Sequence, residues 1–139
     1  MAAFQKINSF VEAVAEKVHN LGADTLKVML TNTAPLSTNT VKANLTEILA
    51  GNGYTAGGAT PAISSSAQTS GTYKLVLADV VFTAAGGSIG PFRYATLYND
   101  TATNDELIGF WDYGSSITLL TGETFTWDAD PSTGILTNA

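Results

Sequence analysis

Turn-forming residues interrupt most of this chain, so that its apolar residues lie in short segments roughly ten residues apart. The boundaries include Ser70-Gly71, Gly86-Gly87, Asn99-Asp100, Thr121-Gly122 and Asp130-Pro131. The segments between them are rich in residues that favour strands and lie at 62–68, 72–83, 91–99, 106–113, 115–120, 123–128 and 134–138. A further strand at 25–31 has apolar residues on both faces and is expected at the centre of a sheet. The pattern predicts a mainly β fold, an antiparallel β-sandwich or jelly roll of about eight strands.

The first 22 residues differ from the rest, because their apolar residues follow a helical spacing. Apolar side chains recur every three or four residues from Phe4 to Leu21, as on one face of an amphipathic helix. Ser9 and Glu12 fit a capping box, and Gly22 fits the position after the C-terminus. We therefore expect a helix at about residues 7–20, with an irregular strand rich in Val and Ala as the alternative. The whole chain, 1–139, is expected to form a single domain, with 1–22 as an N-terminal helix or arm and 24–139 as the sandwich.

The charge of the chain argues against several kinds of partner. Six Lys and Arg residues stand against 12 Asp and Glu, for a formal net charge of −6. Binding to nucleic acid or to an anionic membrane needs clustered cations, and no two basic residues are adjacent here. No apolar run approaches the ~20 residues that span a bilayer, and the N-terminus has no secretion signal. We expect no nucleic-acid or membrane partner, and a protein made in the cytoplasm.

Uncharged polar residues replace charged ones in this chain. Only 13% of the residues are charged, whereas there are 20 Thr, 10 Ser and 9 Asn. Hydroxyl and amide groups are less costly to remove from water than ions. The composition therefore suits surfaces that pack against other proteins. A Thr-rich β domain without such a partner explains it equally well.

Motifs for catalysis are missing from the sequence. The single histidine, His19, stands at the end of the expected helix, where a capping or surface position accounts for it, and no Gly-x-Ser-x-Gly motif accompanies it. The glycine-rich stretch 51–58 lacks the lysine of a phosphate-binding loop. A pair of carboxylates for glycoside hydrolysis could be chosen from Asp79, Asp112 and Asp128, but 12 acidic residues in any β domain would allow such a choice. We expect no enzymatic activity, no catalytic residue and no cofactor-binding residue.

Calcium binding is a weak alternative to a protein without any metal. Asp128-Ala129-Asp130 followed by Gly134 resembles the start of a calcium loop, although Pro131 interrupts it and no Glu closes it. A second oxygen-rich loop contains Asn99-Asp100 and Asn104-Asp105-Glu106. Hairpin turns held by Asx hydrogen bonds explain both loops more simply. We therefore expect no metal site.

Arg93 is the only arginine and lies in a segment otherwise suited to burial. A guanidinium in such a strand needs a carboxylate partner, which Asp79 or Asp112 on a neighbouring strand would provide. A position at the strand edge, with the guanidinium in water, is a simpler alternative. A further hypothesis is a bidentate contact to a carboxylate of an adjacent subunit.

Two stretches are the most distinctive in the chain: Gly51-Asn52-Gly53-Tyr54-Thr55-Ala56-Gly57-Gly58 and Leu107-Ile108-Gly109-Phe110-Trp111-Asp112-Tyr113-Gly114. Together with 10–12, 18–21, 24–31, 47–48, 88–94 and 97–100, they resemble a family of small virion proteins of tailed bacteriophages and prophages. The resemblance extends over nearly the whole chain. It implies a structural component of the virion and does not by itself give a position in the particle.

Within that class the small size, the low charge, the absence of cysteine and the compact β body favour a capsid decoration, or cementing, protein, which the resemblance implies is bound in many copies outside the head. Its partners would be the major capsid protein and further copies of itself, and its location the capsid of the virion. The expected interface anchors are Phe4, Phe10, Tyr54 in its loop, Arg93, and Trp111 if it faces outward. A tail or head–tail subunit or the base of a head fibre is the nearest alternative. A carbohydrate-binding module with exposed aromatic residues is a further one.

Overall fold

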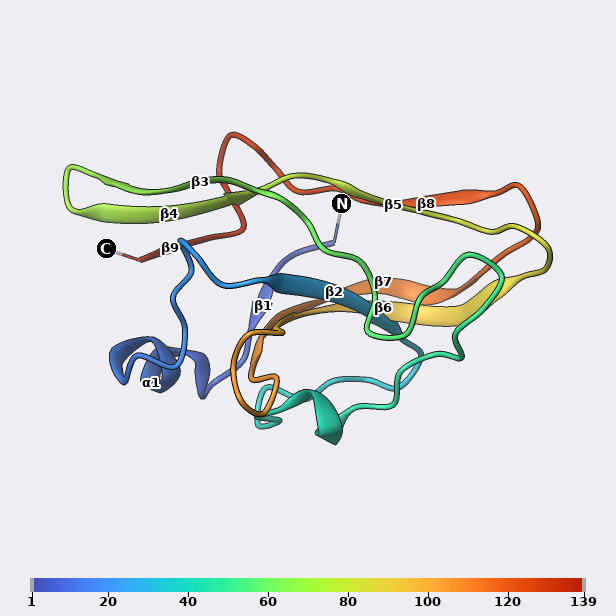
Figure 1. Cartoon of the computed structure of the whole chain (residues 1–139), viewed down its shortest axis with the longest axis horizontal. Coiled ribbons are helices and arrows are strands. Elements are labelled where there is room, and N and C mark those ends of the chain that lie inside the picture. The colour runs from blue at the N-terminus through green and yellow to red at the C-terminus, as the bar shows by residue number, and fades with distance from the viewer. Residues whose placement is uncertain (1, 139) are drawn as a thin grey trace.

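The computed structural model describes residues 2–138, and its elements are mainly β-strands (Figure 1). The strands are β1 (Gln5–Lys6), β2 (Leu26–Thr31), β3 (Ile63–Thr69), β4 (Thr72–Leu77), β5 (Val80–Thr83), β6 (Ile89–Asn99), β7 (Leu107–Leu119), β8 (Thr124–Trp127) and β9 (Leu136–Asn138). The helical elements are α1 (Phe10–Ala15) and the 3-10 helix η1 (Lys42–Asn44). Between residues 2 and 138, no helix has the length and apolar character needed to cross a membrane.

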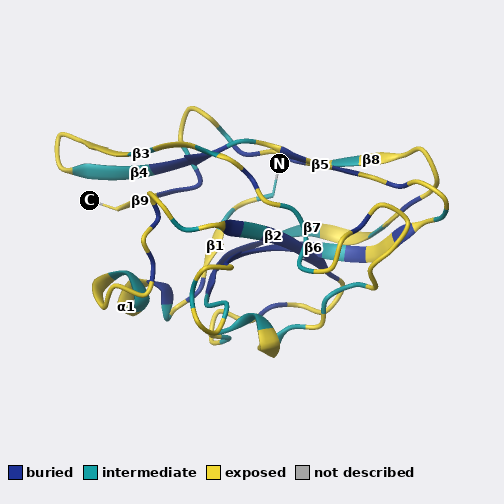
Figure 2. Cartoon of the chain, viewed as in Figure 1, coloured by how far each residue is buried: buried dark blue, intermediate teal, exposed yellow. Residues whose placement is uncertain are grey.

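The strands form two facing layers. One layer is the four-stranded sheet β1-β7-β6-β2, and the other contains the sheets β3-β4-β9 and β5-β8 (Figure 1). The pairings between these strands are all antiparallel. Inward-facing side chains of both layers make the main core (Figure 2), in which Leu26, Leu75, Phe92 and Trp127 are each at most 1% exposed. The predicted mainly β, antiparallel, β-sandwich-like domain is thus confirmed.

The four-stranded sheet is covered on its outer face as well. The long connection between β2 and β3 runs across that face (Figure 1). A smaller buried cluster lies there, consisting of Ile7, Met29, Tyr98, Leu107 and Phe110, with Leu45 packed against it. Covering both faces explains why four successive residues at the end of β2, 28–31, are all buried.

β2 is the last strand of its sheet, so the expected central position is wrong. Backbone groups of the connecting loop occupy its free edge: Val28 and Ala59 exchange hydrogen bonds of 2.8 and 3.0 Å. The Ile48 amide donates to the Leu30 carbonyl oxygen at 3.1 Å. On the same edge, the Leu30 amide donates to the Tyr54 hydroxyl at 3.1 Å. The connecting loop therefore closes the edge of β2 that no other strand covers.

Two predicted strand boundaries also differ from the structure. The segment 72–83 contains two strands, β4 and β5, which separate at Ala78-Asp79. The Asp79 carboxylate accepts a hydrogen bond from the Ala129 amide at 2.7 Å, and this holds the break in place. The segments at 106–113 and 115–120 form one strand, β7, which passes through Gly114 at a φ of 88°. A glycine in this conformation bends a strand without ending it.

The N-terminal segment contains a helix of six residues in place of the expected helix at 7–20. Residues 5–6 form β1, which pairs with β7. The helix ends early because Lys17 adopts a φ of 67°, and the Val18 amide then donates to the Ala13 carbonyl oxygen at 2.8 Å. This is a Schellman motif with lysine at the position that glycine usually takes. Gly22 therefore does not end the helix, and Ser9 makes no side-chain capping bond.

Candidate functional site

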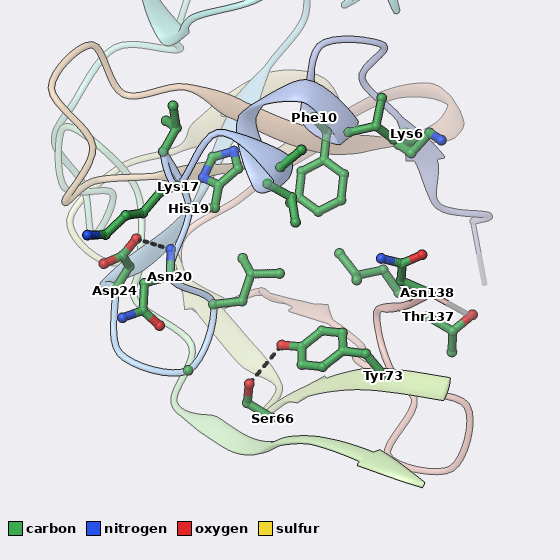
Figure 3. A pocket seen from close by; sticks show the side chains of 17 residues that line it. Lys6, Phe10, Lys17, His19, Asn20, Asp24, Ser66, Tyr73, Thr137 and Asn138 are labelled. Carbon is green, nitrogen blue, oxygen red and sulfur yellow. Dashed lines mark hydrogen bonds between the residues drawn. The ribbon is translucent and has the colours of Figure 1, made fainter. Parts of the chain in front are cut away.

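A groove lies where α1 and the turn after it face the β3-β4-β9 sheet (Figure 3). Its volume is about 760 Å³, within the ~300–1,000 Å³ of pockets that bind ligands. One wall consists of α1 and residues 17–22. The other consists of Ser66 on β3, Tyr73 on β4 and residues 136–138 on β9. The groove is therefore built from opposite ends of the chain.

Six large apolar side chains line the groove among polar ones. They are Phe10, Val11, Val14, Val18, Leu21 and Leu136. Val11 is 55% exposed and Val18 is 37% exposed, so this chain leaves apolar surface uncovered in a concave position. Such surfaces mark sites where another apolar group packs.

Two lysines give the groove positive charge on a chain whose net charge is −6. Lys6 and Lys17 stand at opposite sides of the groove in Figure 3, and neither forms an ion pair with any residue between 2 and 138. Asp24 also lines the groove. Its carboxylate already accepts hydrogen bonds from the Asn20 amide at 2.8 Å and from the Asn99 side chain at 2.7 Å. The two ammonium groups are therefore available to an anionic group.

His19 is buried beside the groove, which corrects the expected capping or surface position; it is 6% exposed. Its Nδ1 accepts a hydrogen bond from the side-chain nitrogen Nδ2 of Asn99 at 2.9 Å, and its ring centroid lies 5.4 Å from that of Phe10. Its Nε2 has no hydrogen-bond partner within residues 2–138. Burial lowers the pKa of His19, and the charges of Glu106 and Asp24 oppose that shift. Neutral His19 thus connects the turn after α1 to β6.

Three of the five expected interface anchors are buried inside the chain itself. Tyr54 is 2% exposed, Trp111 5% and Phe10 7%. Trp111 faces inward: its ring centroid lies 5.1 Å from that of Trp127, edge to face, and 5.2 Å from that of Phe4. Phe4 is partly buried in the same core. Packing within the chain thus already uses these rings, and the condition set for Trp111, that it faces outward, is not met.

Tyr54 fastens the glycine-rich loop to the edge of β2. Its hydroxyl donates to Glu47 Oε2 at 2.7 Å and accepts from the Leu30 amide at 3.1 Å. The same carboxylate oxygen accepts from the Gly57 amide at 2.7 Å, and the Tyr98 hydroxyl donates to the Gly57 carbonyl oxygen at 2.6 Å. Burial raises the pKa of the Tyr54 hydroxyl, and the hydrogen bond to Glu47 raises it further. The loop is therefore held rigidly by its own chain.

Arg93 pairs with Asp112, one of its two predicted partners. Arg93 Nε donates to Asp112 Oδ1 at 2.8 Å, and the guanidinium donates to Oδ2 at 3.1 Å. The Arg93 bond and the Gly114 amide hold the pKa of Asp112 below its usual value. The side chains are 38% and 31% exposed, so the pair lies at the surface. A contact to an adjacent subunit stays a prediction, and the guanidinium would make it in addition to the bond with Asp112.

The loops considered for calcium form Asx turns. Asp130 accepts hydrogen bonds from the Ser132 amide at 2.7 Å and from the Thr133 hydroxyl at 2.8 Å, and both lower the pKa of Asp130. The Asn99 side-chain oxygen accepts from the Thr101 amide at 2.9 Å. In the part of the chain that the structure describes, no three His, Asp or Glu side chains gather as a metal site requires. These oxygens are therefore used to shape the turns.

Comparisons with protein-family models, with curated proteins and with solved structures gave no match to this chain. The site is consequently described from its own residues. The spacing of Phe10, Val14 and Val18 did indicate an apolar face on the N-terminal segment. Nothing in the spacing indicated that part of this face stays uncovered, or that the other wall comes from β9.

Proposed function

We propose that this protein is a structural subunit of a tailed-bacteriophage virion, and specifically a capsid decoration protein that binds the outside of the head. The groove beside α1 carries this proposal. It combines exposed valines with two lysines that have no ion-pair partner among residues 2–138. A surface of this kind suits a protein that acts by contact with other proteins. The sequence resemblance to small virion proteins supplies the biological setting.

The outer face of the β5-β8 sheet supports attachment to a protein shell. Val81 pairs with Thr126 and Thr83 with Thr124 across these strands, and all four residues are exposed. None of them carries a charge, so little free energy is lost when water is removed from this face. A standard protein interface buries ~1,600 Å² in total, and its affinity depends on a few well-packed side chains.

The positions of the aromatic rings support a protein partner over a carbohydrate. A carbohydrate-binding module would need exposed rings on which sugars stack. Here Trp111 is 5% exposed, Trp127 1% and Tyr98 1%. These rings fill the interior, and their large apolar areas stabilise the fold itself.

A self-assembling tail or head–tail subunit is a second candidate, and the β3 strand favours it. β3 is the outer strand of its sheet, and five of its seven residues are exposed. Its sequence, Ile-Ser-Ser-Ser-Ala-Gln-Thr, contains no charge and no proline. Charges and prolines are the usual means of preventing a free edge from pairing with another chain. Pairing of β3 strands from two copies would generate such an assembly.

Assembly assays distinguish the two candidates. Purified protein is incubated alone, and with heads of the encoding phage that were prepared without it. Saturable binding to heads at a fixed ratio to the major capsid protein, with increased resistance of the heads to heat, supports the decoration role. Rings or tubes formed without heads support the tail subunit. A protein that stays monomeric and ignores heads contradicts both candidates.

A further inference from the structure

We propose that the groove beside α1 binds an extended segment of a partner protein, with apolar residues at alternate positions and at least one acidic residue. This inference rests on the proposed function, which supplies the kind of partner. It adds the site on this chain that the partner contacts. The groove is defined by α1, the turn at 17–22, and strands β3, β4 and β9.

The apolar character of the segment follows from the two walls. Val11 and Val18 are among the large apolar residues with at least a third of their surface exposed, and both line this groove. Tyr73 and Leu136 lie on the opposite wall. Side chains that enter between the walls would lose contact with water on both sides, which is the main source of favourable free energy in peptide binding.

The extended conformation follows from the way β9 borders the groove. Leu136, Thr137 and Asn138 are consecutive, and all three line it. Side chains of a strand alternate between its two faces, so if only one face of β9 bordered the groove, only every second residue of β9 would line it. The backbone edge of β9 therefore faces the groove. β9 is the last strand in the order β3-β4-β9, and within residues 2–138 no backbone hydrogen bond joins its residues to a segment other than β4, so this edge is available for a further strand.

The acidic residue follows from the charges around the groove. Lys6 and Lys17 line it without ion-pair partners within residues 2–138. Asp24 also lines the groove and accepts hydrogen bonds from Asn20 and Asn99, so the lining holds two lysines against one carboxylate. The helix carboxylates, Glu12 and Glu16, are not part of the lining. An acidic segment is therefore attracted to this groove even though the chain as a whole is negative.

The partner is another protein because residues 2–138 contain no free segment of the required kind. Its own acidic and apolar stretches are built into the fold. Asp105-Glu106 leads directly into Leu107 and Ile108, which are 1% and 0% exposed in β7. Asp128 and Asp130 precede Ile135 and Leu136, which are 8% and 9% exposed. A second copy would have to unfold part of its core to occupy the groove.

Selection from a library of random ten-residue peptides tests the proposal on the full-length chain. Peptides are selected on the immobilised wild-type protein, after removal of those that bind the empty support. We expect enriched sequences that alternate Val, Ile or Leu with polar residues and carry Asp or Glu. An enriched peptide should shift the NMR signals of the amides at 136–138 and protect them from hydrogen exchange.

Matched variants make the test specific to the groove. Val11→Asp should weaken binding of the enriched peptide by ~10-fold or more. Leu49→Asp is the control, because Leu49 is 92% exposed and is not part of the lining; its affinity should equal that of the wild type. Replacing Lys6 and Lys17 together by Gln should weaken binding and reduce its dependence on salt. Circular dichroism of each variant verifies that it is folded.

Several results would overturn the proposal. They are the absence of any enriched peptide, enrichment of sequences rich in Lys or Arg, and equal binding to Val11→Asp and wild type. Concentration-dependent self-association that Val11→Asp abolishes would assign the groove to a second copy instead. Failure of the virion proposal gives a different result: peptides are enriched as described, but the protein ignores heads.

Discussion

Replacing Tyr54 by Phe removes one oxygen atom from the point where the glycine-rich loop meets the edge of β2. The ring is 2% exposed and would keep its packing, including the contact with Phe82 at 5.9 Å between centroids. The hydroxyl's two hydrogen bonds would be lost, one from the Leu30 amide and one to Glu47. The substitution therefore isolates the polar contribution of Tyr54 to stability.

The expected loss is the sum of two effects. Leu30 is 0% exposed, so its amide would be left unpaired in the interior, at a cost of about 1–3 kcal/mol. The bond to the Glu47 carboxylate is charge-assisted and contributes about 1.5–3 kcal/mol. Glu47 keeps the Gly57 amide at 2.7 Å and the Lys42 ammonium at 3.6 Å, which limits the second effect. We expect Tyr54→Phe to lower the free energy of unfolding by about 3 kcal/mol.

Urea denaturation followed by tryptophan fluorescence measures this loss, because Trp111 and Trp127 are both buried. With an m-value of about 2 kcal/mol/M, the midpoint should fall by about 1.5 M. Tyr98→Phe removes a single bond, from the Tyr98 hydroxyl to the Gly57 carbonyl oxygen, and should lower the free energy of unfolding by only about 1 kcal/mol. The affinity of Tyr54→Phe for heads should equal that of the wild type. A Tyr54→Phe protein as stable as the wild type, or one that loses head binding while staying folded, would refute this account of Tyr54.

Three further predictions concern other parts of the molecule. Gly58 has a φ of 86°, and a methyl group there would overlap the Val28 carbonyl oxygen. Gly58→Ala should therefore lower the free energy of unfolding by about 3 kcal/mol or prevent folding. Gly71 has a φ of 84° but open space around it, so Gly71→Ala should lower the free energy of unfolding by only about 1 kcal/mol in the same urea titration. Burial lowers the pKa of His19 below its ordinary 6.5, so the unfolded chain takes up this proton first and the free energy of unfolding should fall as the pH drops below 6.5. In His19→Gln this fall should be smaller, and an identical pH profile would contradict the assignment. Arg93→Ala removes a half-exposed pair with Asp112, so its effect on the urea midpoint should be smaller than that of Tyr54→Phe and should shrink further in high salt; a larger effect would mean that the pair is structurally essential.

The β-strands were predictable because turn residues mark their ends. Ser70-Gly71 and Thr121-Gly122 do lie between successive strands. Gly114 was misleading, because a glycine with positive φ can bend a long strand as well as end one. The helix was predicted too long for a similar local reason: Lys17 takes the left-handed conformation, which its residue type does not indicate. Local chemistry thus gave the fold class, while exact boundaries depended on single backbone angles.

The candidate site was much less predictable. Tyr54 was identified as an anchor, but the sequence could not show that its target, Leu30, belongs to the same chain. Trp111 was expected to be an anchor only if it faced outward, and the structure shows that Trp127 and Phe4 cover it. The groove itself depends on the approach of α1 to β9, from opposite ends of the sequence. Periodicity describes one element at a time and contains no information about which surfaces remain uncovered after packing.

Co-sedimentation with heads that lack this protein tests the central claim most directly, with wild type, Val11→Asp and Leu49→Asp measured side by side. The account predicts saturable binding of the wild type at a fixed ratio to the major capsid protein. It predicts the same curve for Leu49→Asp, and ~10-fold weaker binding for Val11→Asp. Absence of wild-type protein from the sedimented heads at any concentration would contradict the claim that this chain is a capsid decoration protein.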